Sequence, residues 1–198
     1  MLGKTLTILS LIGLSTLGWG KEIEMTANEV IKKLDLRPLP EEGGYYRETY
    51  RSDAGQVAAK TFGINADSNR VISTGIYYLV VPESFSALHR VRSDEMFHFY
   101  AGDAAEMIQI DEQGNIERIT IGSNIGAGEI PQVLVRRGVW QGLRLKAGGK
   151  WALMGTTVAP GFEFEDFEVG NREEMINQFP HLRNDIIRYT REPNEKAH

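Results

Sequence analysis

The sequence predicts an all-β fold built as an antiparallel sandwich or barrel. Apolar and β-branched stretches follow one another at short, regular spacing between Gly44 and Val158, a pattern typical of such folds. Glycine makes up 21 of the 198 residues, which favours many tight turns. Long helical patterns are few, so the fold class rests on strands.

The first element, residues 1–20, predicts an exported protein. Lys4 is its only charged residue, and the apolar stretch that follows has the length of a signal-peptide core and is short for a membrane span. Small residues at Gly18 and Gly20 suit cleavage before Lys21, after which we expect no attachment to a membrane. The alternatives are an uncleaved anchor and a buried helix.

One short helix is expected on each side of the strands. The first covers Thr26 to Leu36, and Pro38 stops the chain from continuing it. The second covers Arg172 to Phe179, where Asn171 can act as the N-cap and Pro180 ends the helix.

The strands lie between these helices, and no linker or repeat interrupts them. Residues 111–115 are expected to form a hairpin turn, and the nearly continuous apolar run at 71–81 suits a strand buried on both faces. Residues 21–198 are therefore expected to form one domain. The expected strands cover residues 45–51, 71–81, 104–110, 116–121, 132–135, 139–145 and 151–158.

Composition excludes several classes of function. The chain has no cysteine, which rules out disulfides, thiolate metal ligands, iron–sulfur clusters and a cysteine nucleophile. A net charge of −5, with 41% hydrophobic and 25% charged residues, is typical of a soluble globular protein and gives no general field for nucleic acid. Motifs for phosphate loops, dinucleotides or zinc proteases are absent from the sequence.

Candidate chemistry centres on His89 and Glu95, which are six residues apart. This spacing suits no single helix face, but two strands joined by a short turn could bring the side chains together. Imidazole and carboxylate are ligands for divalent iron, manganese, nickel or zinc. The alternative is a histidine satisfied within the core.

Strand alternation extends this site to a possible ligand pocket. Phe97 and Phe99 share the face of Glu95, whereas His98 faces away unless a bulge intervenes. We include all three as candidate ligand-binding residues. The alternative for His98 is a place between the sheets or at a dimer contact.

Two further segments could reach the ligand. Arg47 could anchor an anionic group or close the pocket, and its alternative is a salt bridge at a solvated edge. Glu163 or Asp166 could accept a hydrogen bond from the ligand, and the alternative is an amphipathic strand or loop.

The segment around His89 resembles the first motif of the cupin superfamily, G(X)5HXH(X)3-4E(X)6G. His89, Glu95 and Gly102 occupy the places of the first histidine, the glutamate and the final glycine. Val91 stands where the second histidine is expected, and Glu83 replaces the first glycine.

The second cupin motif, G(X)5PXG(X)2H(X)3N, is recognisable in VRRGVWQGLRL. Gly138 matches its internal glycine, while Arg136 replaces proline, Gln141 replaces the histidine ligand and Leu145 replaces asparagine. Trp140 lies on the opposite strand face from Gln141, and we expect it to pack.

The wider chain resembles the fifth cupin family, a domain of unknown function. GGYYRETYRS at 43–52 and TTVAPGFEFEDFE at 156–168 carry the resemblance, which covers a core of about residues 34–168. It implies a double-stranded β-helix, the RmlC-like jelly roll, with a central cavity. It also implies a homodimer and assigns no settled reaction.

The resemblance further implies that any metal would be held by His89, Glu95 and Gln141, with Val91 filling one ligand place with methyl groups. An amide is a poorer ligand than imidazole, so we expect a divalent metal to be weakly held. The hypothesis is that the cavity takes a small organic molecule.

Three functions stay open at this point. The chain could be an acid–base enzyme, epimerase- or isomerase-like, with His89 as the base or acid and Glu95 fixing its tautomer. It could be a non-catalytic protein that binds a small molecule. It could also be a metal-dependent cupin enzyme with a degenerate site.

Overall fold

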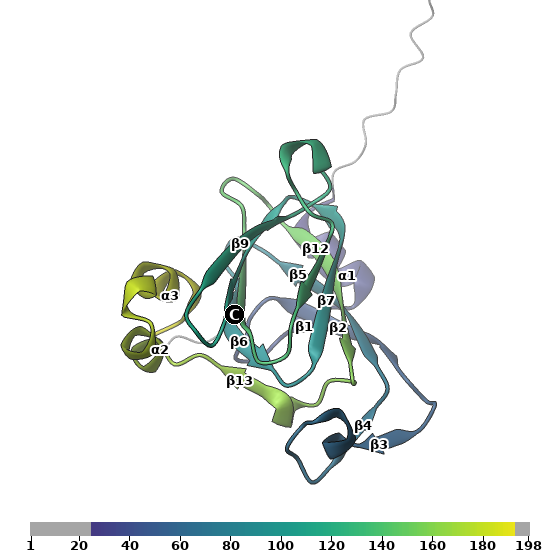
Figure 1. Ribbon diagram of the computed structural model, residues 1–198. Coiled ribbons are helices and arrows are strands. Elements are labelled where there is room, and N and C mark those ends of the chain that lie inside the picture. Colours follow the sequence, from purple (N-terminus) through teal and green to yellow (C-terminus); the bar gives the residue numbers. More distant parts are fainter. Residues whose placement is uncertain (1–24, 193–198) are drawn as a thin grey trace, which may run out of the picture.

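Two antiparallel β-sheets face each other in a computed structural model of the chain, which describes residues 25–192 (Figure 1). The larger sheet contains, in spatial order, β1 (Arg37–Pro38), β2 (Tyr45–Arg51), β5 (Thr74–Val80), β12 (Ala152–Ala159), β7 (Asp94–Gly102) and β10 (Gln132–Val135). The smaller sheet contains β13 (Phe167–Val169), β6 (Ser86–Val91), β11 (Trp140–Leu145), β8 (Ala105–Ile110) and β9 (Ile116–Ile121). The arrangement is a jelly roll, which confirms the predicted fold class.

Shorter elements connect and cover the two sheets. Strands β3 (Gln56–Ala58) and β4 (Asn69–Val71) pair as a separate hairpin that projects from one end of the barrel (Figure 1). The helices are α1 (Ala27–Leu34), α2 (Arg172–Gln178) and α3 (Arg183–Tyr189). The 3-10 turns are η1 (Ala59–Phe62), η2 (Ile125–Ala127), η3 (Phe164–Asp166) and η4 (Pro180–Leu182).

Helix α1 confirms the first predicted helix. A capping box starts it, because the Thr26 side chain accepts from the Glu29 backbone N–H and the Glu29 side chain accepts from the Thr26 backbone N–H. Its apolar face packs Val30 against Leu36 and Leu79 on the outside of the larger sheet.

Helices α2 and α3 cover the outer face of the smaller sheet (Figure 1). Asn171 caps α2 as predicted, by accepting hydrogen bonds from two backbone N–H groups. Trp140 packs beneath these helices, which confirms that it faces away from Gln141. Helix α3 is an addition to the prediction, and it approaches so closely that a Cβ on Gly142 would lie 2.9 Å from the Tyr189 ring.

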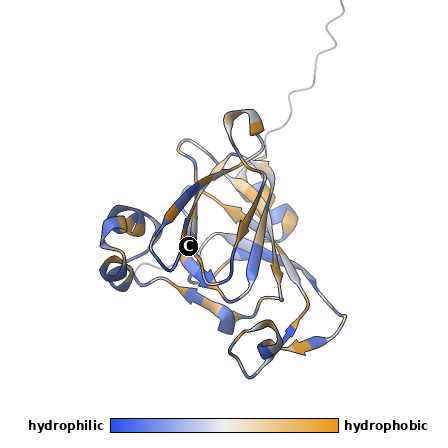
Figure 2. Cartoon of the chain, viewed as in Figure 1, coloured by the Kyte–Doolittle hydropathy of each residue, from blue (hydrophilic) through white to orange (hydrophobic). Residues whose placement is uncertain are grey.

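The main core fills the space between the sheets. Figure 2 shows hydrophobic and hydrophilic positions alternating along the strands, as expected when one strand face is buried. The core is formed by Leu39, Tyr78, Val80, Phe97, Ala105, Met107, Ile121, Val133, Val135, Leu143, Ala152 and Met154.

One predicted strand is divided in the structure. The run expected at 71–81 contains the end of β4 at Val71 and the whole of β5, with a bend between them at Ile72. Strand β4 pairs with β3, while β5 lies between β2 and β12. The continuous apolar pattern concealed this change of sheet.

The predicted signal peptide, residues 1–20, lies outside the described residues. Within residues 25–192, none of the helices combines the length and the apolar character needed to span a membrane.

Candidate functional site

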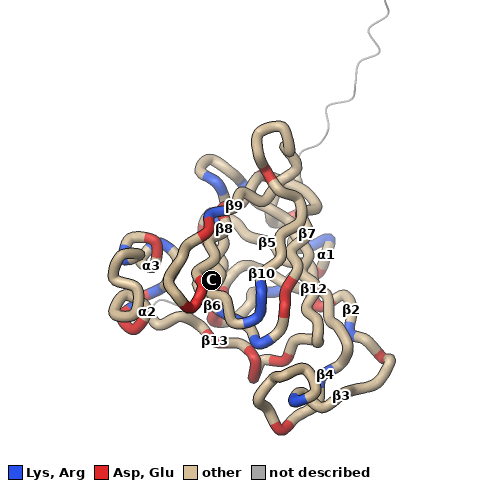
Figure 3. Tube along the Cα trace, viewed as in Figure 1, with Lys and Arg blue, Asp and Glu red and all other residues tan. Residues whose placement is uncertain are grey.

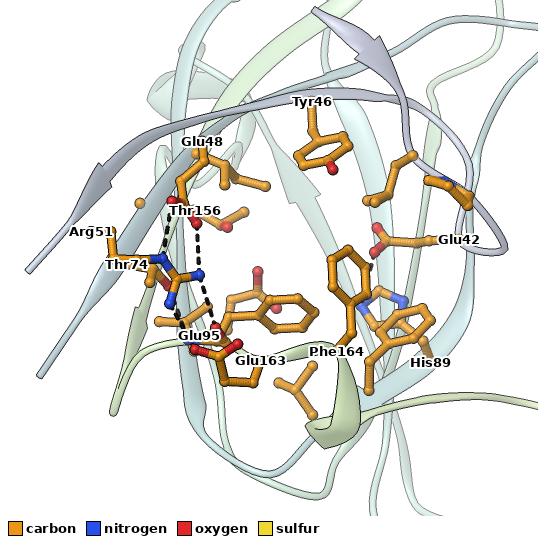
Figure 4. A pocket seen from close by; sticks show the side chains of 18 of the residues that line it. Glu42, Tyr46, Glu48, Arg51, Thr74, His89, Glu95, Thr156, Glu163 and Phe164 are labelled. Atoms are coloured by element: carbon orange, nitrogen blue, oxygen red, sulfur yellow. Dashed lines mark hydrogen bonds and ion pairs between the residues drawn. The ribbon is translucent and has the colours of Figure 1, made fainter. Parts of the chain in front are cut away.

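A cavity of about 200 Å³ lies between the two sheets (Figure 4). Strands β1, β2, β5, β6, β7, β12 and β13 contribute to it, together with the turn before β2 and the segment before β13. Its polar and charged lining consists of Arg37, Glu42, Glu48, Arg51, Thr74, His89, Glu95, Thr156 and Glu163. Its apolar lining includes Leu39, Pro40, Tyr46, Ile76, Val91, Val158, Phe162, Phe164 and Phe167.

His89 enters the cavity from β6 and is only 3% exposed. Its Nδ1 lies 2.8 Å from the Ala87 carbonyl oxygen. Since a carbonyl can only accept, Nδ1 carries the proton and a neutral ring keeps a lone pair on Nε2. The Ala87 carbonyl therefore fixes the tautomer, which corrects the expectation that Glu95 does so.

Glu42 is the carboxylate beside the His89 Nε2, with its Oε2 at 3.8 Å. Its other oxygen, Oε1, accepts a hydrogen bond of 2.8 Å from the Ser86 hydroxyl. Glu42 is 9% exposed and lies in the tight turn before β2. It was not predicted, because no local pattern distinguishes it from a solvated turn residue.

Glu95 extends from β7 and is joined to Gln141 of β11. The Gln141 Nε2 donates to the Glu95 Oε2 at 2.7 Å, while the Gln141 Oε1 has no partner within the described residues. Burial raises the pKa of the Glu95 carboxyl, against the opposing effects of His89 and of hydrogen bonds from Gln141 and Thr156. The structure thus brings together all three residues predicted around a metal, since Gln141 also pairs with His89 in the β-ladder.

An ion-pair network stands at one side of the cavity, opposite His89 and Glu42 (Figure 4). The Arg51 guanidinium donates to both oxygens of Glu48, at 3.0 and 2.9 Å, and to Glu163 at 2.7 Å. A further contact of 3.3 Å reaches the Phe162 carbonyl oxygen. The network joins β2 to the segment before β13. Glu163 lies in the cavity lining, as the alternative with a role in ligand binding requires.

A buried ion pair supports the same segment from outside. Arg70 of β4 donates two hydrogen bonds to Asp166, at 2.6 and 2.8 Å, and also contacts Glu165 at 2.8 Å. Figure 3 shows how acidic positions gather just before β13. Asp166 is therefore occupied by Arg70 and lies outside the cavity lining.

Two predicted pocket residues belong to the barrel core instead. Phe97 and Phe99 share the inner face with Glu95, as alternation predicts, but they pack in the main core and do not line the cavity. The register of β7 against β12 shifts after Phe99, beyond His98. Because this bulge comes after His98 in the strand, it does not turn the His98 side chain inward, and His98 faces outward as alternation predicts.

His98 and Arg47 were predicted near the ligand, and both lie away from the cavity. On the outside of the larger sheet, His98 contacts the Thr157 hydroxyl and the Gln132 amide, each at 3.2 Å. Arg47 stacks over the Tyr77 ring, with 5.5 Å from its guanidinium carbon to the ring centroid. Strand alternation explains both placements.

The donor set does not fit a tightly held transition metal. Val91 places methyl groups in the lining next to His89, and Gln141 turns its N–H group, not its carbonyl oxygen, towards Glu95. Within residues 25–192, no group of three or more histidine, aspartate or glutamate side chains could hold a metal ion. One imidazole and one adjacent carboxylate are a weak site for such a metal.

Comparisons with known proteins agree with this architecture. Residues 28–170 match the family described as "Cupin superfamily (DUF985)". The uncharacterized protein YML079W of Saccharomyces cerevisiae is 26% identical over 132 residues, which cover 63% of this chain. The match spans 66% of the yeast protein, just under two thirds of its length. A hypothetical protein from Leishmania major is 31% identical with a TM-score of 0.77, covering 85% of this chain and 100% of its own. Protein SO0799 from Shewanella oneidensis is 32% identical with a TM-score of 0.75, covering 85% and 99%. The chain therefore belongs to the cupin superfamily, in the family of unknown function described as DUF985.

Proposed function

We propose that this protein binds a small organic molecule in the cavity and transfers a proton to or from it through His89. The observation that carries the proposal is the orientation of the buried imidazole. Nδ1 is held by the Ala87 carbonyl, while Nε2 makes no hydrogen bond within the described residues and belongs to a side chain that lines the cavity. A fixed tautomer with a free lone pair is suited to a general base.

Two carboxyl groups complete this arrangement. When Nε2 takes a proton from the ligand, the imidazolium that forms is stabilised by Glu42 at 3.8 Å. Burial favours the neutral acid form of Glu95 by raising its pKa, and that form can return a proton to the ligand. A base and an acid lining one cavity are the requirements of epimerase- and isomerase-like chemistry.

Hydrogen exchange in D₂O tests the proton transfer. The protein is incubated with aldoses, hydroxyketones and aminoketones, and proton NMR follows the C–H next to the carbonyl group. We expect one class to lose this signal with the wild type and to keep it with His89→Gln. His98→Gln is the matched control, because His98 lies outside the cavity, and it should exchange like the wild type.

Binding without catalysis is the second candidate. The aromatic rings of Phe162, Phe164 and Phe167 in the lining favour it, because they offer apolar surface that retains a ligand without reacting. Ligand binding with no exchange in any class would support this candidate and contradict proton transfer. Failure of every compound to bind would contradict both.

Export and dimer formation stay predictions. Export is supported by the apolar segment at 1–20, and N-terminal sequencing of protein recovered from the cell envelope tests it. The homodimer is supported by the family resemblance, and sedimentation equilibrium tests it.

A further inference from the structure

The charges of the residues that line the cavity are unbalanced. Arg51 is already engaged by Glu48 and Glu163, and Arg37 lies over the Tyr46 ring at 5.1 Å. Glu42 and Glu95 are 9% and 7% exposed, and the cation nearest to them in the lining is a histidine that is charged only when protonated. The lining carries four carboxyl groups against two guanidinium groups: Glu42, Glu48, Glu95 and Glu163 against Arg37 and Arg51.

Hydrogen-bond acceptors predominate at the same place. His89 is 3% exposed and, as a neutral ring, presents the Nε2 lone pair without a donor in the described residues. Glu42 receives a hydrogen bond from Ser86, and Glu95 receives hydrogen bonds from Gln141 and Thr156, which leaves further lone pairs on both carboxyl groups. Buried acceptors of this kind require donors, so a ligand rich in N–H groups is complementary to them.

Aromatic rings supply the remaining recognition. The Phe167 ring lies 5.2 Å from the His89 ring, and Phe162 and Phe164 meet edge to face at the same distance. Aromatic faces attract cations and also bury apolar groups. The cavity thus offers acceptors and negative charge beside a wall that suits a compact apolar body.

We propose that the ligand of this cavity is a small organic ammonium compound. Its N–H groups donate to Glu42, Glu95 and the His89 Nε2, and its apolar part lies against the phenylalanine rings. This inference rests on the proposed use of the cavity as a binding site and names the chemical class that the site takes.

Three probes of similar shape test the charge preference: benzylammonium, benzyl alcohol and benzoate. NMR titrations of the purified protein near neutral pH give their affinities. We expect benzylammonium to bind at least about tenfold more tightly than benzyl alcohol, and benzoate to bind most weakly. Glu42→Gln should reduce benzylammonium affinity about tenfold or more and leave benzyl alcohol binding intact. Glu117→Gln, an exposed change on β9, should alter neither.

The outcomes separate this inference from the proposed function. If benzyl alcohol binds as tightly as benzylammonium, or benzoate binds more tightly, the cavity binds organic molecules but the ammonium class is wrong. If none of the three binds at millimolar concentration, both proposals fail. Should a variant not fold, the order of affinities in the wild type alone decides.

Discussion

The ion pair of Arg70 and Asp166 supports the segment that carries Glu163 and three phenylalanines into the cavity, so its removal provides a quantitative test. Arg70→Met leaves the Asp166 carboxylate, whose side chain is 1% exposed, without the two hydrogen bonds of 2.6 and 2.8 Å. Breaking a buried pair from one side costs about 3 to 5 kcal/mol. Arg92, 3.9 Å from the same carboxylate, remains as a partial counter-charge and favours the lower end of that range.

Urea and thermal unfolding measure this loss. A loss of about 3 to 5 kcal/mol corresponds to a fall in Tm of about 6 to 20 °C for a chain of this size. The double variant Arg70→Met, Asp166→Leu should recover most of the stability, because no unpaired charge is left buried. The surface pair Arg136–Asp94, whose side chains are 71% and 37% exposed, is the control, and Arg136→Met should cost at most about 1 kcal/mol.

Two results would refute the reasoning. One is a loss below about 1 kcal/mol for Arg70→Met, comparable to an exposed pair. The other is a double variant no more stable than the single variant, since the cost would then not come from the stranded carboxylate.

Three further changes have defined outcomes. Because burial raises the pKa of Glu95, the folded state binds that proton more tightly than the unfolded state, and wild-type stability falls as pH rises from about 4.5 through the raised pKa. Glu95→Gln should therefore be stabilising in urea at pH 7 and nearly neutral at pH 4; equal effects at both would contradict this. Gly142→Ala, with its Cβ 2.9 Å from the Tyr189 ring, should cost about 1 to 3 kcal/mol, and an unchanged Tm would contradict the close approach. Thr26→Ala removes a capping box and should cost about 1 kcal/mol in urea unfolding; no loss would show that the cap is not needed.

Elements whose position depends on the local sequence pattern could be predicted from the sequence. The hairpin of β8 and β9 has alternating apolar residues and a Gly-containing turn, and its strands lie where the sequence predicts them. Helix α3 was not predictable in this way, because its apolar side chains acquire a partner only when Gly142 admits Tyr189 against the sheet. That contact depends on residues 47 positions apart in the sequence.

Some residues of the candidate site were likewise predictable from the sequence, and others were not. His89 and Glu95 were identified from their spacing, and the structure places both in the cavity lining. On β2 the sequence offered Arg47 as a candidate, whereas Arg51 reaches the cavity. The register of β2 against β5 shifts between Glu48 and Tyr50, and this bulge places Glu48 and Arg51 on one face although alternation alone would separate them.

Val91 and Gln141 stand where the cupin motifs have histidines. Restoring these histidines tests why the present side chains do not fit a metal. Val91 lines the cavity two residues after His89 on the same strand, and Gln141 pairs with His89 across the ladder. Val91→His with Gln141→His would therefore offer three imidazoles beside Glu95, a donor set that suits nickel or manganese. We expect this double variant to bind Ni²⁺ at least about tenfold more tightly than the wild type in calorimetry, because imidazole replaces methyl and amide groups. Gln141→His alone should fall between them. Tight Ni²⁺ binding by the wild type, or no gain in the double variant, would contradict the argument that these two side chains determine the metal affinity of the cavity.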